Sequence, residues 1–142
     1  MKKICYLTGL LFFVFISVNS LFAADIKGAY QTYTKKLRTC SPYTYNVDGE
    51  STIIRIVGRY NRRCIVRTYT YDSKVECTYK TEDLKNYIKA LPPSNVYVNS
   101  LTKTPGELDT KSIEILEKYS ETNKQFINDG ICKSNAPENE KH

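Results

Sequence analysis

The chain has 142 residues, 41% of them hydrophobic, and a formal net charge of +6. This length suits one small domain and excludes a large multidomain enzyme, a collagen-like chain and a polytopic membrane protein. The only histidine is the last residue, His142. Catalytic sets that need an internal imidazole are therefore excluded as well.

The first 23 residues have the layout of a secretory signal peptide. Lys2 and Lys3 precede an apolar run from Ile4 to Val18, and Ala23 follows shortly after. This order of charge, apolar core and small residues is typical of an export signal that is removed. We expect an exported protein, periplasmic or secreted, with no membrane span after cleavage. The alternative is an uncleaved anchor over residues 4–24, which are just enough to cross a bilayer; the chain would then be an envelope structural protein.

Removal of the signal leaves residues 24–142, a net charge of +4 and four cysteines, Cys40, Cys64, Cys77 and Cys132. An even number of cysteines in an exported domain predicts two disulfides. A four-cysteine zinc site normally requires closely spaced cysteine pairs. The spacings here are 24, 13 and 55 residues, which favours disulfides over a metal site.

A helix followed by a β-meander is the predicted order of the first half. Ile26, Tyr30, Tyr33 and Leu37 recur at helical spacing, and Cys40-Ser-Pro ends the helix. Residues rich in Ile, Val, Tyr and Thr then predict strands, with Asp48-Gly49 as a hairpin turn. The expected strands are Tyr43–Val47, Ser51–Tyr60, Arg63–Tyr71 and Lys74–Lys80.

Two-residue turns at Asn61-Arg62 and Asp72-Ser73 set the expected register of the meander. The core face should then carry Ile53, Val57, Cys64, Val66, Val75, Cys77 and Tyr79. Ile54 and Ile56 should lie on the other face. The same register separates Arg63 and Arg67 from Arg55 and Arg59.

This register also limits the disulfide pairing. Cys77 would lie opposite Thr68, and Thr68 is four residues from Cys64, about 13 Å along the strand. Because the Cα atoms of a disulfide lie within about 7 Å, Cys64 should not pair with Cys77. Each should instead join a flanking element through Cys40 or Cys132.

Helices are expected in the second half, with one further short strand. The periodicity predicts helices over Glu82–Leu91, with Thr81 as N-cap, and over Thr110–Asp129, with Gly130 after its end. Val96–Val98 is a predicted strand. The fold class is therefore α+β, with a meander of about four strands, in one domain over residues 24–133. Residues 134–142 form a polar tail expected to be disordered.

The candidate binding site is the tip of the central hairpin. Five of the six arginines lie within residues 55–67, and no acidic residue occurs between Glu50 and Asp72. Arginine suits phosphate and carboxylate because its planar fork bonds two oxygens at once, and tyrosine offers a ring for stacking. We expect Arg59, Tyr60, Arg62 and Arg63 to bind an anionic glycan, lipid, nucleic acid or acidic protein. The alternative is that these side chains are merely solvent-exposed on the surface of the sheet and bind no ligand.

Catalytic constellations are nearly absent from the sequence. No serine or cysteine nucleophile set, metalloprotease motif or phosphate-binding glycine loop occurs. No catalytic residue, metal or cofactor is therefore predicted, and a binding module is favoured over an enzyme. The competing hypothesis is a small exported hydrolase that uses paired carboxylates. The candidate pairs are Asp48 with Glu50, Glu82 with Asp83, and Glu114 with Glu117.

Overall fold

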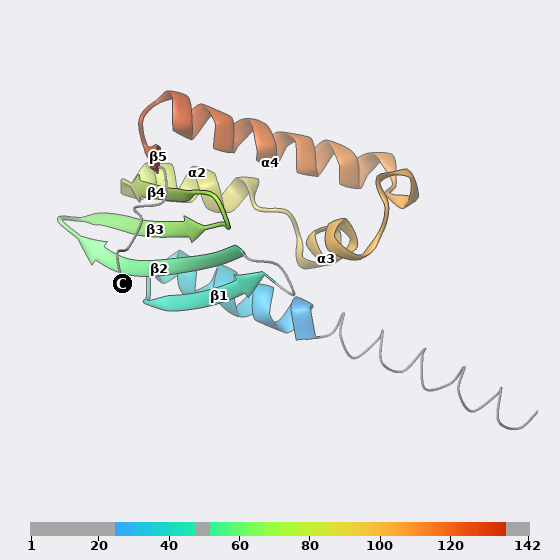
Figure 1. Cartoon of the computed structure of the whole chain (residues 1–142), viewed down its shortest axis with the longest axis horizontal. Helices are drawn as coiled ribbons and strands as arrows, with labels where there is room; N and C mark the ends of the chain where they lie inside the picture. Colours follow the sequence, from blue (N-terminus) through green and yellow to red (C-terminus); the bar gives the residue numbers. More distant parts are fainter. Residues whose placement is uncertain (1–24, 48–51, 136–142) are drawn as a thin grey trace, which may run out of the picture.

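The computed structural model describes residues 25–47 and 52–135. An N-terminal helix over residues 25–39 precedes a single antiparallel sheet of five strands in the order β1-β2-β3-β4-β5. Three helices separate β4 from β5 in the sequence, and the helices cover one face of the sheet (Figure 1). The predicted α+β class with two disulfides is confirmed. The strands are β1 (Tyr43–Val47), β2 (Thr52–Tyr60), β3 (Arg63–Tyr69), β4 (Lys74–Tyr79) and β5 (Cys132–Asn135).

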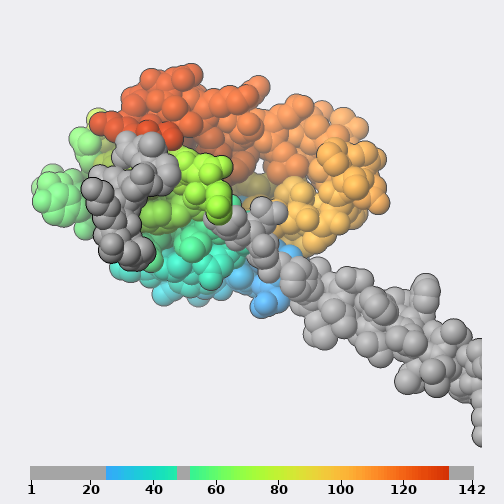
Figure 2. All heavy atoms as spheres, in the orientation of Figure 1, coloured from blue at the N-terminus to red at the C-terminus, as the bar shows by residue number. Residues whose placement is uncertain are grey.

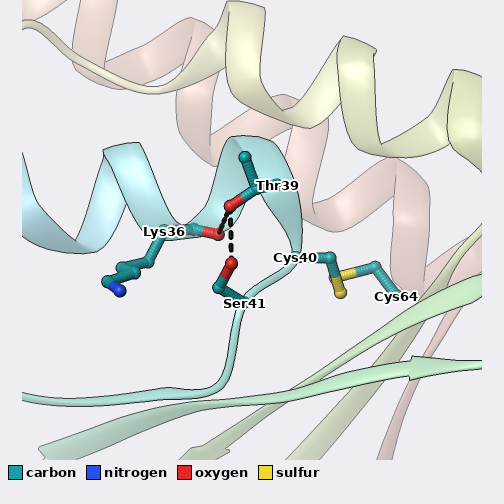
Figure 3. Close-up of a disulfide and its surroundings, with 5 residues drawn as sticks. All are labelled: Lys36, Thr39, Cys40, Ser41 and Cys64. Atoms are coloured by element: carbon teal, nitrogen blue, oxygen red, sulfur yellow. Dashed lines mark hydrogen bonds between the residues drawn. A yellow bond between two sulfur atoms is a disulfide. The ribbon is translucent and has the colours of Figure 1, made fainter.

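The N-terminal helix buries the face that its periodicity predicts. Ile26, Tyr30, Tyr33 and Leu37 are all buried. The helix ends at Cys40, which has a φ of +51° and so turns the chain out of the helix. The Ser41 N–H donates to the Lys36 carbonyl at 2.9 Å. The Thr39 hydroxyl donates to the same carbonyl at 3.1 Å and lies 2.7 Å from the Ser41 hydroxyl (Figure 3). The turn delivers Cys40 to the sheet, where it bonds Cys64.

The β2–β3 hairpin has the predicted two-residue turn but not the predicted regular ladder. Tyr60 is the partner of Arg63, and the turn residues Asn61 and Arg62 have φ values of +47° and +63°. Both central residues therefore have the positive φ of a type I′ turn. Further along, Ile56 pairs with Val66 but Gly58 pairs with Ile65, so one residue of β2 is left over. Val57 is the extra residue of a β-bulge.

This bulge reverses the predicted faces of β2. Ile56 is buried and Ile54 half-buried, whereas Ile53 and Val57 are each 38% exposed. The core face predicted for Ile53–Val57 was therefore wrong. The extra residue moves the side chains on the far side of the bulge from the turn to the opposite face of the sheet. On β3 and β4 the predicted core face is correct: Cys64, Val66 and Tyr79 are buried.

The β3–β4 turn is longer than predicted. Tyr69 pairs with Lys74, and the Thr70 N–H donates to the Ser73 carbonyl at 2.8 Å. Cys77 consequently lies opposite Val66, not opposite Thr68. Cys64 and Cys77 are then diagonal neighbours, about 7–8 Å apart, which is nearer than the sequence suggested.

The prediction that these two cysteines do not pair is confirmed. The disulfides are Cys40–Cys64 and Cys77–Cys132, with Cα–Cα distances of 5.8 and 4.0 Å. Each bond joins a central strand to a flanking element. Such bonds are typical of proteins exported to an oxidising compartment.

The helices between β4 and β5 are α2 (Thr81–Ala90), α3 (Ser94–Thr102) and α4 (Thr110–Asn128). A single 3-10 turn, η1 (Pro105–Glu107), precedes α4. The N-cap of α2 is Lys80 and not Thr81. Asp109 begins α4, its carboxylate accepting the Ser112 N–H at 2.8 Å, and Gly130 ends it with a φ of +71°. β5 includes Ser134, which was expected in the disordered tail.

The predicted strand at Val96–Val98 is wrong. These residues lie in α3, which begins directly after Pro93 and takes its first hydrogen bond from the Tyr97 N–H to the Pro93 carbonyl. Val96 and Val98 are buried on the helix. Packing overrides the β propensity of valine here, because Tyr97 stacks on Tyr30 with ring centroids 4.0 Å apart.

Tyrosines make up much of the core between the helices and the sheet. Tyr33 stacks on Tyr45 at 5.2 Å, and Tyr79 stacks on Tyr87 at 5.0 Å. Several phenolic hydroxyls are paired inside the protein. Their bonds are Tyr30 to the Pro92 carbonyl at 2.8 Å, Tyr45 to Tyr97 at 3.2 Å, and Tyr87 to Tyr119 at 3.2 Å.

The opposite face of the sheet, here called the outer face, has no described helix over it. In Figure 1 the N-terminal helix and α2 lie behind the strands. The register assigns to this face Ile53 and Arg55 of β2, Arg63, Ile65, Arg67 and Tyr69 of β3, and Lys74 and Glu76 of β4. Of the described residues, then, those that face the core are largely apolar and aromatic, whereas the outer face carries three of the six arginines.

Candidate basic site on the central hairpin

The β2–β3 turn projects from one end of the molecule. Figure 2 shows it as the green protrusion at the left. Arg59, Arg62 and Arg63 are exposed, and Tyr60 is 69% exposed. All four residues that the sequence predicted as a site therefore lie at this exposed tip. Tyr60 and Arg63 are cross-strand partners on the outer face, whereas Arg59 is the partner of Cys64 and lies on the opposite face.

The side chains of this tip are not neutralised by the described part of the chain. The two ion pairs among the described residues are Arg67–Glu76 and Lys85–Glu82. Neither involves Arg59, Arg62 or Arg63. Because an unpaired guanidinium keeps all of its donors for a partner, the tip carries three available cations, of which Arg63 shares a face with the Tyr60 ring.

A second basic group lies on the outer face. The bulge at Val57 makes Arg55 the direct cross-strand partner of Arg67, and Tyr69 pairs with Ile53 and Lys74. The sequence prediction that Arg55 lies on the opposite face from Arg63 and Arg67 is therefore wrong. Gly58 inside a β-rich run was the signal that could have revealed the bulge, because glycine in a strand often marks one.

Contacts within this second group hold its cations in place. The Arg67 Nε donates to Glu76 Oε2 at 2.6 Å, and this hydrogen bond raises the pKa of Arg67 above its usual value. The Arg55 guanidinium lies 5.9 Å from the centroid of the Tyr69 ring, and the Lys74 ammonium lies 6.0 Å from it. These are cation–π distances.

A hollow of about 530 Å³ lies beside Arg63, between β4 and the ends of α2 and α4. Glu76, Asp83 and Asp129 line it together with Arg63, Lys80 and Lys133. Each carboxylate has a structural partner or position: Glu76 binds Arg67, Asp83 accepts the Lys80 N–H at 3.2 Å, and Asp129 is the C-cap of α4. The mixed charge of this hollow does not favour a polyanion.

The other candidate carboxylates are not brought together at a cleft. Glu82 forms an exposed ion pair with Lys85, and Glu114 and Glu117 are exposed on α4. Asp48 and Glu50 lie outside the described residues, as does the turn predicted at Asp48-Gly49. In residues 25–47 and 52–135, no group of three or more His, Cys, Asp or Glu is placed to bind a metal.

The predicted export signal, and the alternative of an anchor over residues 4–24, also lie outside the described residues. None of the helices that the structure describes is long and apolar enough to cross a membrane. Comparison of the chain with protein-family models, curated proteins and solved structures finds no match.

Proposed function

We propose that this protein is an exported binding domain that engages an anionic partner through the β2–β3 tip. The observation that carries the proposal is the exposed group of Arg59, Arg62 and Arg63, which have no acidic partner among the described residues. Tyr60, exposed beside them, adds a ring that can stack on the partner. The two disulfides support an extracytoplasmic location, periplasmic or secreted.

The shape of the site supports binding more than catalysis. A hydrolase that uses two carboxylates needs them to converge on a substrate pocket. The acids around the hollow beside Arg63 are instead engaged in an ion pair and at helix ends. The tip, by contrast, is convex and reachable from several directions (Figure 2).

The test is a comparison of binding between the native protein and the triple variant Arg59→Ala, Arg62→Ala, Arg63→Ala. Both are titrated with polygalacturonate, lipopolysaccharide, an oligonucleotide and an acidic protein at low and moderate salt. We expect salt-sensitive binding to one of these classes, because ionic contacts at an exposed surface are screened. The triple variant should bind at least about tenfold more weakly, given the strength of hydrogen bonds to charged groups.

A matched control removes the same charge elsewhere. Lys111, Lys118 and Lys124 are exposed on α4, so their replacement by alanine lowers the net charge equally without touching the tip. This control should bind as the native protein does. Equal weakening in both triple variants would mean that binding follows net charge alone, and the tip would then have no specific role.

A further inference from the structure

The basic surface continues beyond the tip along the outer face of the sheet. Arg63 and Arg67 lie on the same face of β3, and the bulge turns Arg55 of β2 to that face as well. Lys74 joins them from β4 through its pairing with Tyr69. From Arg63 to Tyr69 the strand spans about 20 Å. The cations therefore form an extended path along the direction of β3 and are not gathered around one point.

The arrangement of two of these arginines costs stability. Arg55 and Arg67 are direct cross-strand partners, and like charges in this position destabilise a sheet. Glu76 pairs with Arg67, but no described acid pairs with Arg55 or Lys74. A bound anion would relieve this repulsion. The pair of arginines is therefore better explained by ligand binding than by a contribution to folding.

The Tyr69 ring restrains two of the cations in position for ligand binding. Its ring is half-buried, and it has the Arg55 guanidinium and the Lys74 ammonium at 5.9 and 6.0 Å. These contacts restrain long flexible side chains while leaving their charge uncompensated. Restraint of this kind lowers the entropy lost on binding.

We infer that the ligand is an acidic polysaccharide, bound as an extended chain from the tip to the group of Arg55, Tyr69 and Lys74. The inference rests on the proposed function and names its ligand class. Carboxylate or sulfate groups repeated along a linear sugar chain match cations repeated along a strand. The arginine forks bind such groups with two hydrogen bonds each.

The aromatic residues favour a polysaccharide over a single-stranded nucleic acid. Proteins that bind single strands stack successive bases on a series of aromatic rings. The two most exposed rings, Tyr60 at 69% and Tyr71 at 85%, lie in the turns that flank β3 at its two ends. Ile65 and Arg67 occupy the strand between them, and the one ring there, Tyr69, is half-buried and already has the Arg55 and Lys74 cations at cation–π distance.

The test uses oligogalacturonates of increasing length and two charge-reversal variants. Arg55→Glu places a carboxylate beside Arg67 and should leave the fold intact or raise its melting temperature. Lys111→Glu changes the charge equally in the exposed first turn of α4, far from the outer face, where a negative charge is favourable. Calorimetric titration of both variants and of the native protein gives the affinity for each oligomer.

We expect affinity to rise with oligomer length until the chain spans about 20 Å. Arg55→Glu should weaken the long oligomers at least about tenfold, as expected for a lost charge-assisted contact. It should leave the shortest oligomer, which binds at the tip, unaffected, and Lys111→Glu should change neither. An affinity independent of length, or an unchanged affinity of Arg55→Glu for long oligomers, overturns the inference.

Two further comparisons separate the possible failures. An oligodeoxythymidylate of equal length that binds as tightly as the oligogalacturonate overturns the assignment to polysaccharide. If the tip variant with Arg59, Arg62 and Arg63 replaced loses all binding while Arg55→Glu loses none, the proposed function stands and the extended path fails. Binding lost only in Arg55→Glu would instead overturn the tip as the primary site.

Discussion

Gly58 has a φ of +123° in the middle of β2, directly after the extra residue Val57. This conformation is readily adopted only by glycine, because a Cβ atom makes it strained. A Cβ added at Gly58 would also lie 3.5 Å from Cγ of Pro42, an ordinary contact. The bulge therefore depends on the absence of a side chain for conformational reasons more than for space.

Gly58→Ala should lower the free energy of unfolding by about 1–3 kcal/mol, the usual cost of a strained backbone conformation. Urea denaturation of the disulfide-bonded protein measures it. Gly28→Ala is the matched control, since Gly28 lies in a helix with open space around it and alanine should stabilise it by up to about 1 kcal/mol. Equal stability of Gly58→Ala and the native protein would contradict the role of the bulge.

For single residues, the sequence predicted the side-chain positions wherever the strands alternate regularly and missed them where the bulge interrupts the alternation. The faces of β3 and β4 follow from alternation, and Cys64 and Val66 are buried as expected. The faces of β2 do not, because Val57 breaks the alternation by a single residue. The basic group on the outer face was missed for the same reason, since regular pairing would have placed Arg55 with Arg59 and away from Arg67.

At the scale of elements, each disulfide closes a different part of the chain. Cys40–Cys64 joins the end of the N-terminal helix to β3, with a sequence separation of 24 residues. Cys77–Cys132 joins β4 to β5, with a separation of 55 residues, and so ties down the end of α4. The longer ring restricts the unfolded chain more.

Replacing Cys77 and Cys132 by alanine should therefore cost about 4 kcal/mol, and replacing Cys40 and Cys64 slightly less, about 3.5 kcal/mol. Denaturant unfolding of the two double variants tests the order. Hydrogen exchange should also show faster exchange in β5 for the first variant only. A smaller cost for the longer ring would show that native packing, and not chain entropy, determines the contribution of these bonds.

Long periodic elements were predictable, whereas short ones depended on their surroundings. The helix that buries Tyr30, Tyr33 and Leu37 and the helix α4 have enough turns for their apolar spacing to be recognised. Val96–Val98 is too short to distinguish a strand from a buried helix by spacing. Its state is decided by Tyr97 stacking on Tyr30, a contact between residues 67 positions apart in the chain.

For the molecule as a whole, the tyrosine core makes the free energy of unfolding depend on pH in the alkaline range. Burial raises the pKa of Tyr33, Tyr79 and Tyr87 in the native state above the value of about 10 that they have when unfolded. The unfolded state thus releases these protons first as the pH rises. Their contribution to stability is intact below pH 10 and is lost progressively above it.

The free energy of unfolding should fall by at least about 4 kcal/mol for each pH unit above 10, from about 1.4 kcal/mol for each of these three tyrosines; burial also raises the pKa of Tyr30 and Tyr97, which steepens the slope further. Denaturant unfolding at a series of alkaline pH values measures this slope. Tyr79→Phe removes one of these phenols and should reduce the slope by about 1.4 kcal/mol for each pH unit. A stability independent of pH in this range would mean that these hydroxyls ionise in the folded protein as they do in the unfolded chain.

The two disulfides also divide the covalent chain into consecutive rings, 40–64 and 77–132, which do not overlap. A protease that cuts once inside either ring leaves a nicked molecule still held together by a sulfur bridge. Only the connecting stretch of residues 65–76 lacks this protection between the rings, and it includes the exposed turn residues Thr70, Tyr71 and Asp72. A single cut at this turn would leave two pieces with no covalent link, one carrying the arginine tip and the other carrying α2, α3 and α4, held together only by the pairing of β3 with β4 and by core packing.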